Sequence, residues 1–257
     1  MSPKEAKTGE LLPYGYGADQ GAGFETVSDK DLVLPMLSVL QPLSKQVSGA
    51  TKVPGAEPGK LFDTVTEEAF DEAGFVPACI EHCFVEWVPR DAGGGLVARH
   101  RPDSEAVLKA KAESTKFGKY KVGTNDLVEP YYVYGLLFRD GRAAPAVIPF
   151  TSTKIGVYKK WITNLRLFVI STADGKVTPP LFAHSVKVKT VAQSNKKGNF
   201  FNLSLAPLKG GVQDSLIDSK DERYRAAKQL KEMVASGHAK IAEDSQDSPA
   251  EPETEVF

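Results

Sequence analysis

Long apolar runs are missing from this 257-residue sequence, and no stretch approaches the ~20 residues that a membrane-crossing helix needs. Residues 1–5 also lack the apolar segment of a secretory signal. Cysteine is scarce: Cys79 and Cys83, four residues apart in one apparent strand, are the only two. A disulfide framework is therefore not expected, and a reducing cytoplasm with no membrane association is the expected setting.

Patterns typical of catalytic and metal-binding sites are equally scarce. Cys79, His82 and Cys83 lie close together in the sequence, but a structural zinc site needs four ligands and no second Cys/His pair follows. Acidic pairs such as Glu67-Glu68 do not assemble the carboxylate cluster of a two-metal nuclease. We therefore interpret the cysteines as buried strand residues, and expect no enzymatic activity, no metal and no cofactor.

Short β-like runs, together with 22 glycines and 17 prolines, favour a mainly β fold of barrel or sandwich type. Asp140-Gly141 stands between two such runs and predicts a hairpin. In the run that ends near Thr190, apolar residues alternate with lysines, which predicts a strand with one apolar and one cationic face. The expected strands cover residues 75–88, 131–138, 144–150, 182–190 and 200–205.

Helical spacing of apolar residues predicts an amphipathic helix over 153–168. Residues 102–114 form either a short polar helix or a mobile loop. Ser219 and Glu222 form a plausible capping box for a helix over 219–236. The expected domains are a flexible arm (1–24), a mainly β, α+β core with inserted helices (25–212), a C-terminal helical segment (213–242) and a disordered acidic tail (243–257).

The net charge of −1 hides two segments of opposite sign. Residues 243–257 contain six acidic residues and no lysine or arginine. Without those six, 27 acidic residues remain against 32 basic ones, a net charge of +5. Residues 154–201 hold nine basic residues and one acid, Asp174. So strong a bias exceeds that of an ordinary solvated face and indicates an anionic partner.

Aromatic residues are interleaved with these cations, and single-stranded nucleic acids bind through both. Tyr158 and Trp161 are as well explained as core residues, and one of Phe200 and Phe201 is expected in the core. The predicted nucleic-acid-binding residues are Lys154, Tyr158, Lys159, Lys160, Trp161, Arg166, Lys187, Lys189, Lys196, Lys197 and Phe200. A lesser patch comprises Lys116, Lys119 and Tyr120, and either extends the groove or is a mobile loop.

The tail combines acids with a terminal aromatic residue, which is typical of a short linear ligand. Its ring can enter an apolar pocket of a partner while its carboxylates pair with basic side chains. A solubilising role is the alternative, but it gives no reason to expose the final phenylalanine. The predicted partner-binding residues are Glu251, Glu253, Glu255, Val256 and Phe257.

This acidic tail with a terminal Phe resembles that of bacterial and phage single-stranded DNA-binding proteins. The layout of the rest of the chain is similar to the phage-encoded members, at residues 31–35, 58–62 and the lysine-rich hairpin that contains Phe200-Phe201. The resemblance implies an OB-like β-barrel that binds a strand across one sheet face and its loops. It also implies strand protection in phage DNA replication, recombination or repair, and contact with a polymerase, helicase or primase. The long Gly/Gln-rich linker of the bacterial proteins is missing, so their tetramer is not carried over, and a monomer and a dimer both stay open.

Two other classes of function remain as alternatives. One is a phage accessory protein that binds a host or phage partner, for example a nuclease inhibitor or recombination mediator, with little DNA affinity of its own. The other is a nucleic-acid enzyme, which would need a clustered acidic or Cys/His site. A structural virion protein would leave the tail unexplained.

Overall fold

The computed structural model describes residues 22–27, 33–49, 51–173, 175–196, 198–207, 210–237 and 240–241. The predicted tail (243–257) and most of the predicted N-terminal arm (1–24) lie outside these residues. None of the described helices is long and apolar enough to cross a membrane.

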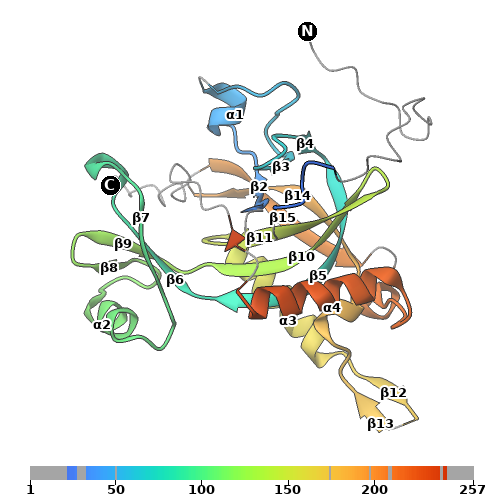
Figure 1. The fold of residues 1–257 in the computed structure, drawn as a ribbon. Coiled ribbons are helices and arrows are strands. Elements are labelled where there is room, and N and C mark those ends of the chain that lie inside the picture. Colours follow the sequence, from blue (N-terminus) through green and yellow to red (C-terminus); the bar gives the residue numbers. More distant parts are fainter. Residues whose placement is uncertain are drawn as a thin grey trace.

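A five-stranded antiparallel sheet forms the centre of the molecule (Figure 1). When its strands are numbered 1 to 5 along the chain, they lie side by side in the order 3-2-1-4-5. Helix α3 (Lys154–Leu167) lies in the connection between the third and fourth strands. This strand order is that of an OB-type Greek key, and the mainly β, α+β prediction is confirmed, whereas the predicted barrel is not closed within the described residues. The five strands are β5 (Glu72–His82), β10 (Tyr131–Arg139), β11 (Arg142–Phe150), β14 (Val186–Asn195) and β15 (Gly198–Pro207).

Backbone hydrogen bonds do not close this sheet into a barrel within the described residues. Strand β2 (Leu37–Val39) lies between the two edge strands and contacts both. On the β11 side, Met36 forms an isolated bridge with Val147. On the β15 side, the Gln41 side-chain amide donates to the Phe201 carbonyl over 2.8 Å, and its oxygen accepts from the Phe201 N–H over 2.9 Å. The Gln41 side chain thus takes the place of a backbone pair between strands, and the barrel stays partly open.

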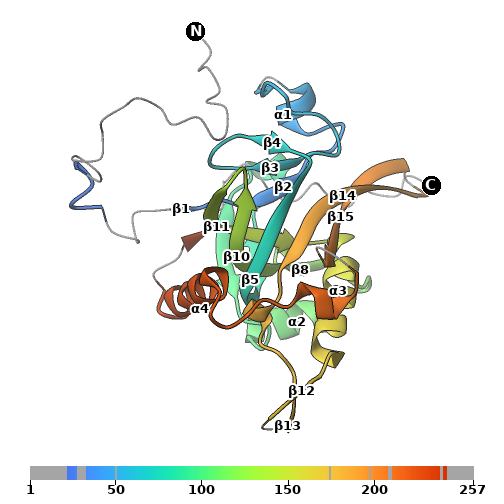
Figure 2. The ribbon, with the colours of Figure 1, turned by 90° about the vertical axis from the view of Figure 1, so that its right-hand side faces the viewer.

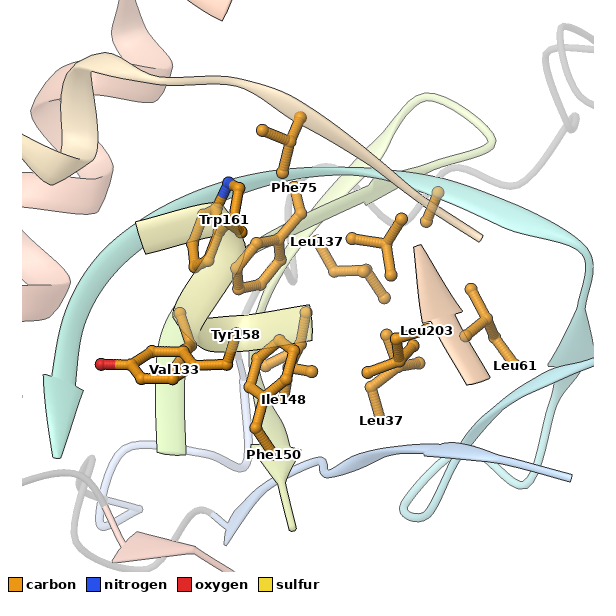
Figure 3. Close-up of a cluster of buried hydrophobic side chains, with 14 of the residues drawn as sticks. Leu37, Leu61, Phe75, Val133, Leu137, Ile148, Phe150, Tyr158, Trp161 and Leu203 are labelled. Carbon is orange, nitrogen blue, oxygen red and sulfur yellow. The ribbon is translucent and has the colours of Figure 1, made fainter. Parts of the chain in front are cut away.

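The main core fills the concave side of this sheet, as Figure 3 shows. Alternate residues of β10, such as Val133 and Leu137, point inward with Phe75 of β5. A Cβ at Gly135 would lie 2.3 Å from the Phe75 ring, so only glycine lets this ring cross the strand. Helix α3 packs its apolar face on the same core, which confirms the predicted helix over 153–168.

An insert with its own small core separates the first and second strands of the five-stranded sheet. Its four strands form a second antiparallel sheet in the order β7-β6-β9-β8, with α2 packed on β8. The helical alternative for residues 102–114 is therefore confirmed. The elements are β6 (Phe84–Trp87), β7 (Leu96–His100), α2 (Glu105–Glu113), β8 (Tyr120–Val122) and β9 (Asn125–Val128), and the core residues are Phe84, Val107, Ala110, Tyr120 and Leu127.

Helix α4 (Glu222–Ala235) confirms the predicted C-terminal helix, but its N-cap differs from the prediction. Asp221, not Ser219, caps the helix, because its carboxylate accepts from the Arg223 backbone N–H over 2.9 Å. The Arg223 guanidinium also bonds this carboxylate and lowers the pKa of Asp221 to about 2.

The remaining elements are short. A loop region with α1 lies above the sheet, and the β12–β13 hairpin projects from the body at the opposite side (Figure 2). The elements are β1 (Val33–Leu34), α1 (Lys45–Ser48), β3 (Leu61–Asp63), β4 (Ala69–Phe70), η3 (Arg90–Ala92), β12 (Ile170–Thr172), β13 (Gly175–Val177), η4 (Leu181–Ala183), η5 (Val212–Ser215) and β16 (Lys240–Ile241).

Candidate nucleic-acid interface

The β14–β15 hairpin separates its apolar and cationic residues onto opposite faces. Val186 and Val188 alternate with Lys187 and Lys189, and the valines are buried in the main core. Cross-strand register places Phe200 opposite Gln193 and Ser204 opposite Lys189, so these residues share the lysine side. We call this surface the hairpin face, formed by Lys187, Lys189, Gln193, Phe200 and Ser204.

The charge of the hairpin face is partly neutralised by one acid. The Lys187 ammonium forms an ion pair with Glu72 of β5, and Lys189 stands opposite Glu72 in the ladder. The Lys187 and Glu72 side chains are 37% and 51% exposed, so water screens the pair and it is weak. Lys189 is exposed, as is Lys196 at the hairpin tip, whereas Lys197 lies outside the described residues.

The inner side of the hairpin is fixed by the loop before β3. Gly59 has a φ of +89°, and a Cβ there would lie 2.6 Å from the Phe201 ring. The Thr190 hydroxyl donates to the Gly59 carbonyl on the same side. Both adjacent phenylalanines are half-buried: Phe201 packs on Gly59, and Phe200 belongs to the hairpin face.

Helix α3, which contacts β15 of this hairpin, carries further cations. Lys159, Lys160 and Arg166 are exposed, whereas Lys154 in the first turn is half-buried. Lys159 and Arg166 are seven residues apart and so lie on one side of the helix. The helix and the hairpin are joined where the Asn202 amide donates to the Thr153 carbonyl over 3.4 Å.

Three predicted stacking residues prove to be core residues instead. Tyr158 and Trp161 are only 8% and 7% exposed, and the Tyr158 ring stacks on Tyr131 at 4.5 Å between centroids. Tyr120 is 9% exposed and packs beside Phe84 in the core of the insert. The prediction that these three rings stack on bases is wrong, because the apolar faces that carry them are covered by the rest of the fold.

The outer face of the five-stranded sheet is covered as well. Helix α4 packs on β5 and β10, with Ala227 and Leu230 fully buried against Leu136 and Val76 (Figure 2). This part of the sheet offers no open surface to a strand, contrary to the expectation of binding across a sheet face. The loops and the hairpin remain accessible.

A cleft of about 560 Å³, which no sequence pattern predicted, lies between the end of β5 and the end of β7. Its arginines are paired with acids, Arg101 with Asp103 over 3.1 Å and Arg99 with Glu81 over 3.6 Å. The cleft is therefore charge-balanced, unlike the hairpin tip. Its histidines are also paired, His82 with Glu129 and His100 with Glu86.

The cysteines carry no reactive site in the described structure. Cys83 is buried and Cys79 is half-buried, and neither forms a disulfide. Burial raises the pKa of Cys79 to about 11, so its thiol stays protonated near neutral pH. Within the described ranges, no group of three or more His, Cys, Asp and Glu residues could hold a metal ion.

Comparison with known proteins places the chain in a family. The family model described as Pam3 phage gp34-like protein matches residues 6–240, which is most of the sequence. The chain belongs to this family. It is therefore a bacteriophage protein, as the resemblance to phage proteins implied. No significant match was found among curated proteins or among solved structures.

Proposed function

We propose that this phage protein binds single-stranded DNA without sequence specificity during DNA replication or recombination. One observation supports this most. The OB-like strand order carries exposed lysines and a half-buried phenylalanine on the hairpin that joins its fourth and fifth strands. In OB folds this connection is one of the loops that bind oligonucleotides.

The chemistry of the hairpin face suits a phosphate chain. Lys189 on the hairpin face and Lys196 at the hairpin tip can each contact a phosphate of the same strand, and Phe200 offers part of its ring to a base. Each cation that neutralises a phosphate of a single strand adds about 0.7 to the slope of log K against log salt. Helix α3, which contacts β15, carries further exposed cations that add to the positive charge of this part of the molecule. Because these contacts read the backbone, they are independent of base sequence.

The acidic tail has a separate role in this proposal. Glu251, Glu253, Glu255 and Val256 lead to Phe257, and together they form the ligand for a phage or host polymerase, helicase or primase. Deleting residues 243–257 should leave DNA affinity unchanged or raise it, because six negative charges are removed, while capture of the partner is lost. Loss of DNA binding in this truncation would contradict the separation of roles.

Alanine substitution of the exposed hairpin lysines tests the DNA site. Lys189→Ala with Lys196→Ala should weaken binding to labelled oligo-dT and to mixed sequences alike, and should lower the salt slope by about 1.4. The matched control is Lys109→Ala with Lys228→Ala, which removes two exposed lysines of α2 and α4. An equal loss in the control would refute the assignment of the site. Absence of DNA binding by the unmodified protein would favour the partner-binding accessory protein.

A further inference from the structure

The loop between α2 and β8 holds an aromatic ring almost entirely in water. Phe117 is 94% exposed, more than any other large apolar side chain in the described part of the chain. Isolated exposed apolar residues are common on protein surfaces and need no function by themselves. The surroundings of Phe117 are what distinguish it.

The loop is held in shape by its own hydrogen bonds. The Ser114 hydroxyl lies 2.6 Å from the Lys119 carbonyl and 2.7 Å from that of Lys116, and accepts from the Lys116 N–H over 3.3 Å. The Lys119 N–H donates to the Lys116 carbonyl over 3.2 Å. Gly118 supplies the positive φ of +78° that this turn requires. The ring therefore projects from an ordered turn, so the loop loses little additional conformational entropy when a ligand binds to the ring.

The charges beside the ring are positive and available. Lys116 and Lys119 are both exposed, and neither forms an ion pair with any acid in the described ranges. Lys121, two residues further on, is paired with Asp126 over 3.4 Å and so differs from them. An exposed ring between two unpaired cations is the combination that binds a base and its flanking phosphates.

The position of this loop in the fold fits the same ligand. The insert is the connection between the first and second strands of the OB-like sheet, as the β14–β15 hairpin is between the fourth and fifth. These are the two connections with which OB folds hold oligonucleotides. The two connections lie towards opposite ends of β5, because β14 pairs with residues Glu72 to Phe75 and runs on beyond Glu72 to the hairpin tip, whereas the insert begins after His82.

We propose that Phe117 is a base-stacking residue, and that with Lys116 and Lys119 it forms a second single-stranded DNA contact, distinct from the hairpin face. This inference rests on the proposed function and adds a named site to it. It also replaces Tyr120, the buried neighbour, as the aromatic residue of this patch.

Phe117→Trp gives a direct optical test. The native tryptophans, Trp87 and Trp161, are 5% and 7% exposed, so the new indole would be the one open to solvent. Its emission should be quenched as oligo-dT is added, because stacking brings a base into contact with the ring. The matched control is Leu108→Trp, because Leu108 lies on α2 of the same insert and is 56% exposed. The emission of this variant should stay constant as oligo-dT is added.

Affinity measurements on the same loop complete the test. Phe117→Ala should weaken oligo-dT binding by about 5- to 150-fold, the equivalent of losing one stacked base. Phe117→Tyr should restore binding, whereas Phe117→Leu should not, because an aliphatic side chain has no π-face. Anisotropy of a labelled oligonucleotide is recorded in parallel. Binding without quenching, and without loss in Phe117→Ala, would overturn this inference while the proposed function stands; no anisotropy change in any variant would overturn both.

Discussion

Glu72 should weaken DNA binding by the hairpin face, and its removal gives a prediction that can be worked out from the structure. The carboxylate pairs with Lys187 and stands opposite Lys189 in the neighbouring strand. Glu72→Gln keeps the size of the side chain and removes its charge. Lys187 then becomes available to a phosphate, and the negative charge next to Lys189 disappears.

The expected magnitude follows from counterion release. One additional phosphate contact steepens the salt slope for single-stranded DNA by about 0.7. Glu72→Gln should therefore bind oligo-dT more tightly than the unmodified protein, with an advantage that shrinks about 2.6-fold between 50 and 200 mM salt. Folding stability should change by less than about 1 kcal/mol, because both side chains are partly exposed and water screens their ion pair.

Fluorescence anisotropy of labelled oligo-dT at several salt concentrations measures this slope. Lys187→Ala supplies the control, since it should alter the slope little while Glu72 is present and, in the Glu72→Gln background, should remove the added slope that the released lysine supplies. A Glu72→Gln protein with unchanged or weaker binding would refute the idea that the hairpin face contacts phosphates. Urea denaturation of each variant confirms that the fold is intact.

Three further predictions concern folding. Burial lowers the pKa of His184 from its ordinary value of 6.5 to about 4, so the stability that its neutral form contributes should be fully present above pH 6.5 and lost towards pH 4. Urea unfolding at pH 5 should show a free energy of unfolding about 2 kcal/mol lower than at pH 8. His184→Asn should remove this pH dependence. Gly59→Val should destabilise the protein by more than about 1 kcal/mol, because the valine Cβ would collide with Phe201 and the backbone φ at this position is positive. An unchanged melting temperature in this variant would contradict the role given to this packing. Trp161→Ala should cost about 3–5 kcal/mol in urea unfolding, while oligo-dT affinity of the folded fraction stays unchanged; a selective loss of affinity would return Trp161 to the DNA site.

Local periodicity was enough to predict much of the fold. The alternation of valine and lysine in β14, the Asp140-Gly141 turn and the spacing of apolar residues in α3 each reflect the geometry of a single element. The strand predicted over 75–88 is in fact two strands, since the chain leaves the five-stranded sheet at Cys83 and enters the insert. Periodicity is continuous through this point, so the sequence did not show the break.

The parts of the site that depend on long-range packing could not be predicted. Periodicity placed Tyr158 and Trp161 on one helix face, but only the sheet beneath α3 decides that the face is covered. The pairing of Lys187 with Glu72 joins residues 115 positions apart, and the burial of the outer sheet face by α4 is equally nonlocal. The sequence shows Phe117 as an aromatic residue between lysines, but only the structure shows that its ring is exposed while that of Tyr120 is buried.

The central claim is most directly tested by titrating the unmodified protein with labelled oligo-dT and with a duplex of equal length at salt concentrations from 50 to 200 mM. The account predicts tighter binding to the single strand and a log K that falls linearly with log salt. Binding that is absent at 50 mM salt, or that is as tight for the duplex as for the single strand, would contradict it.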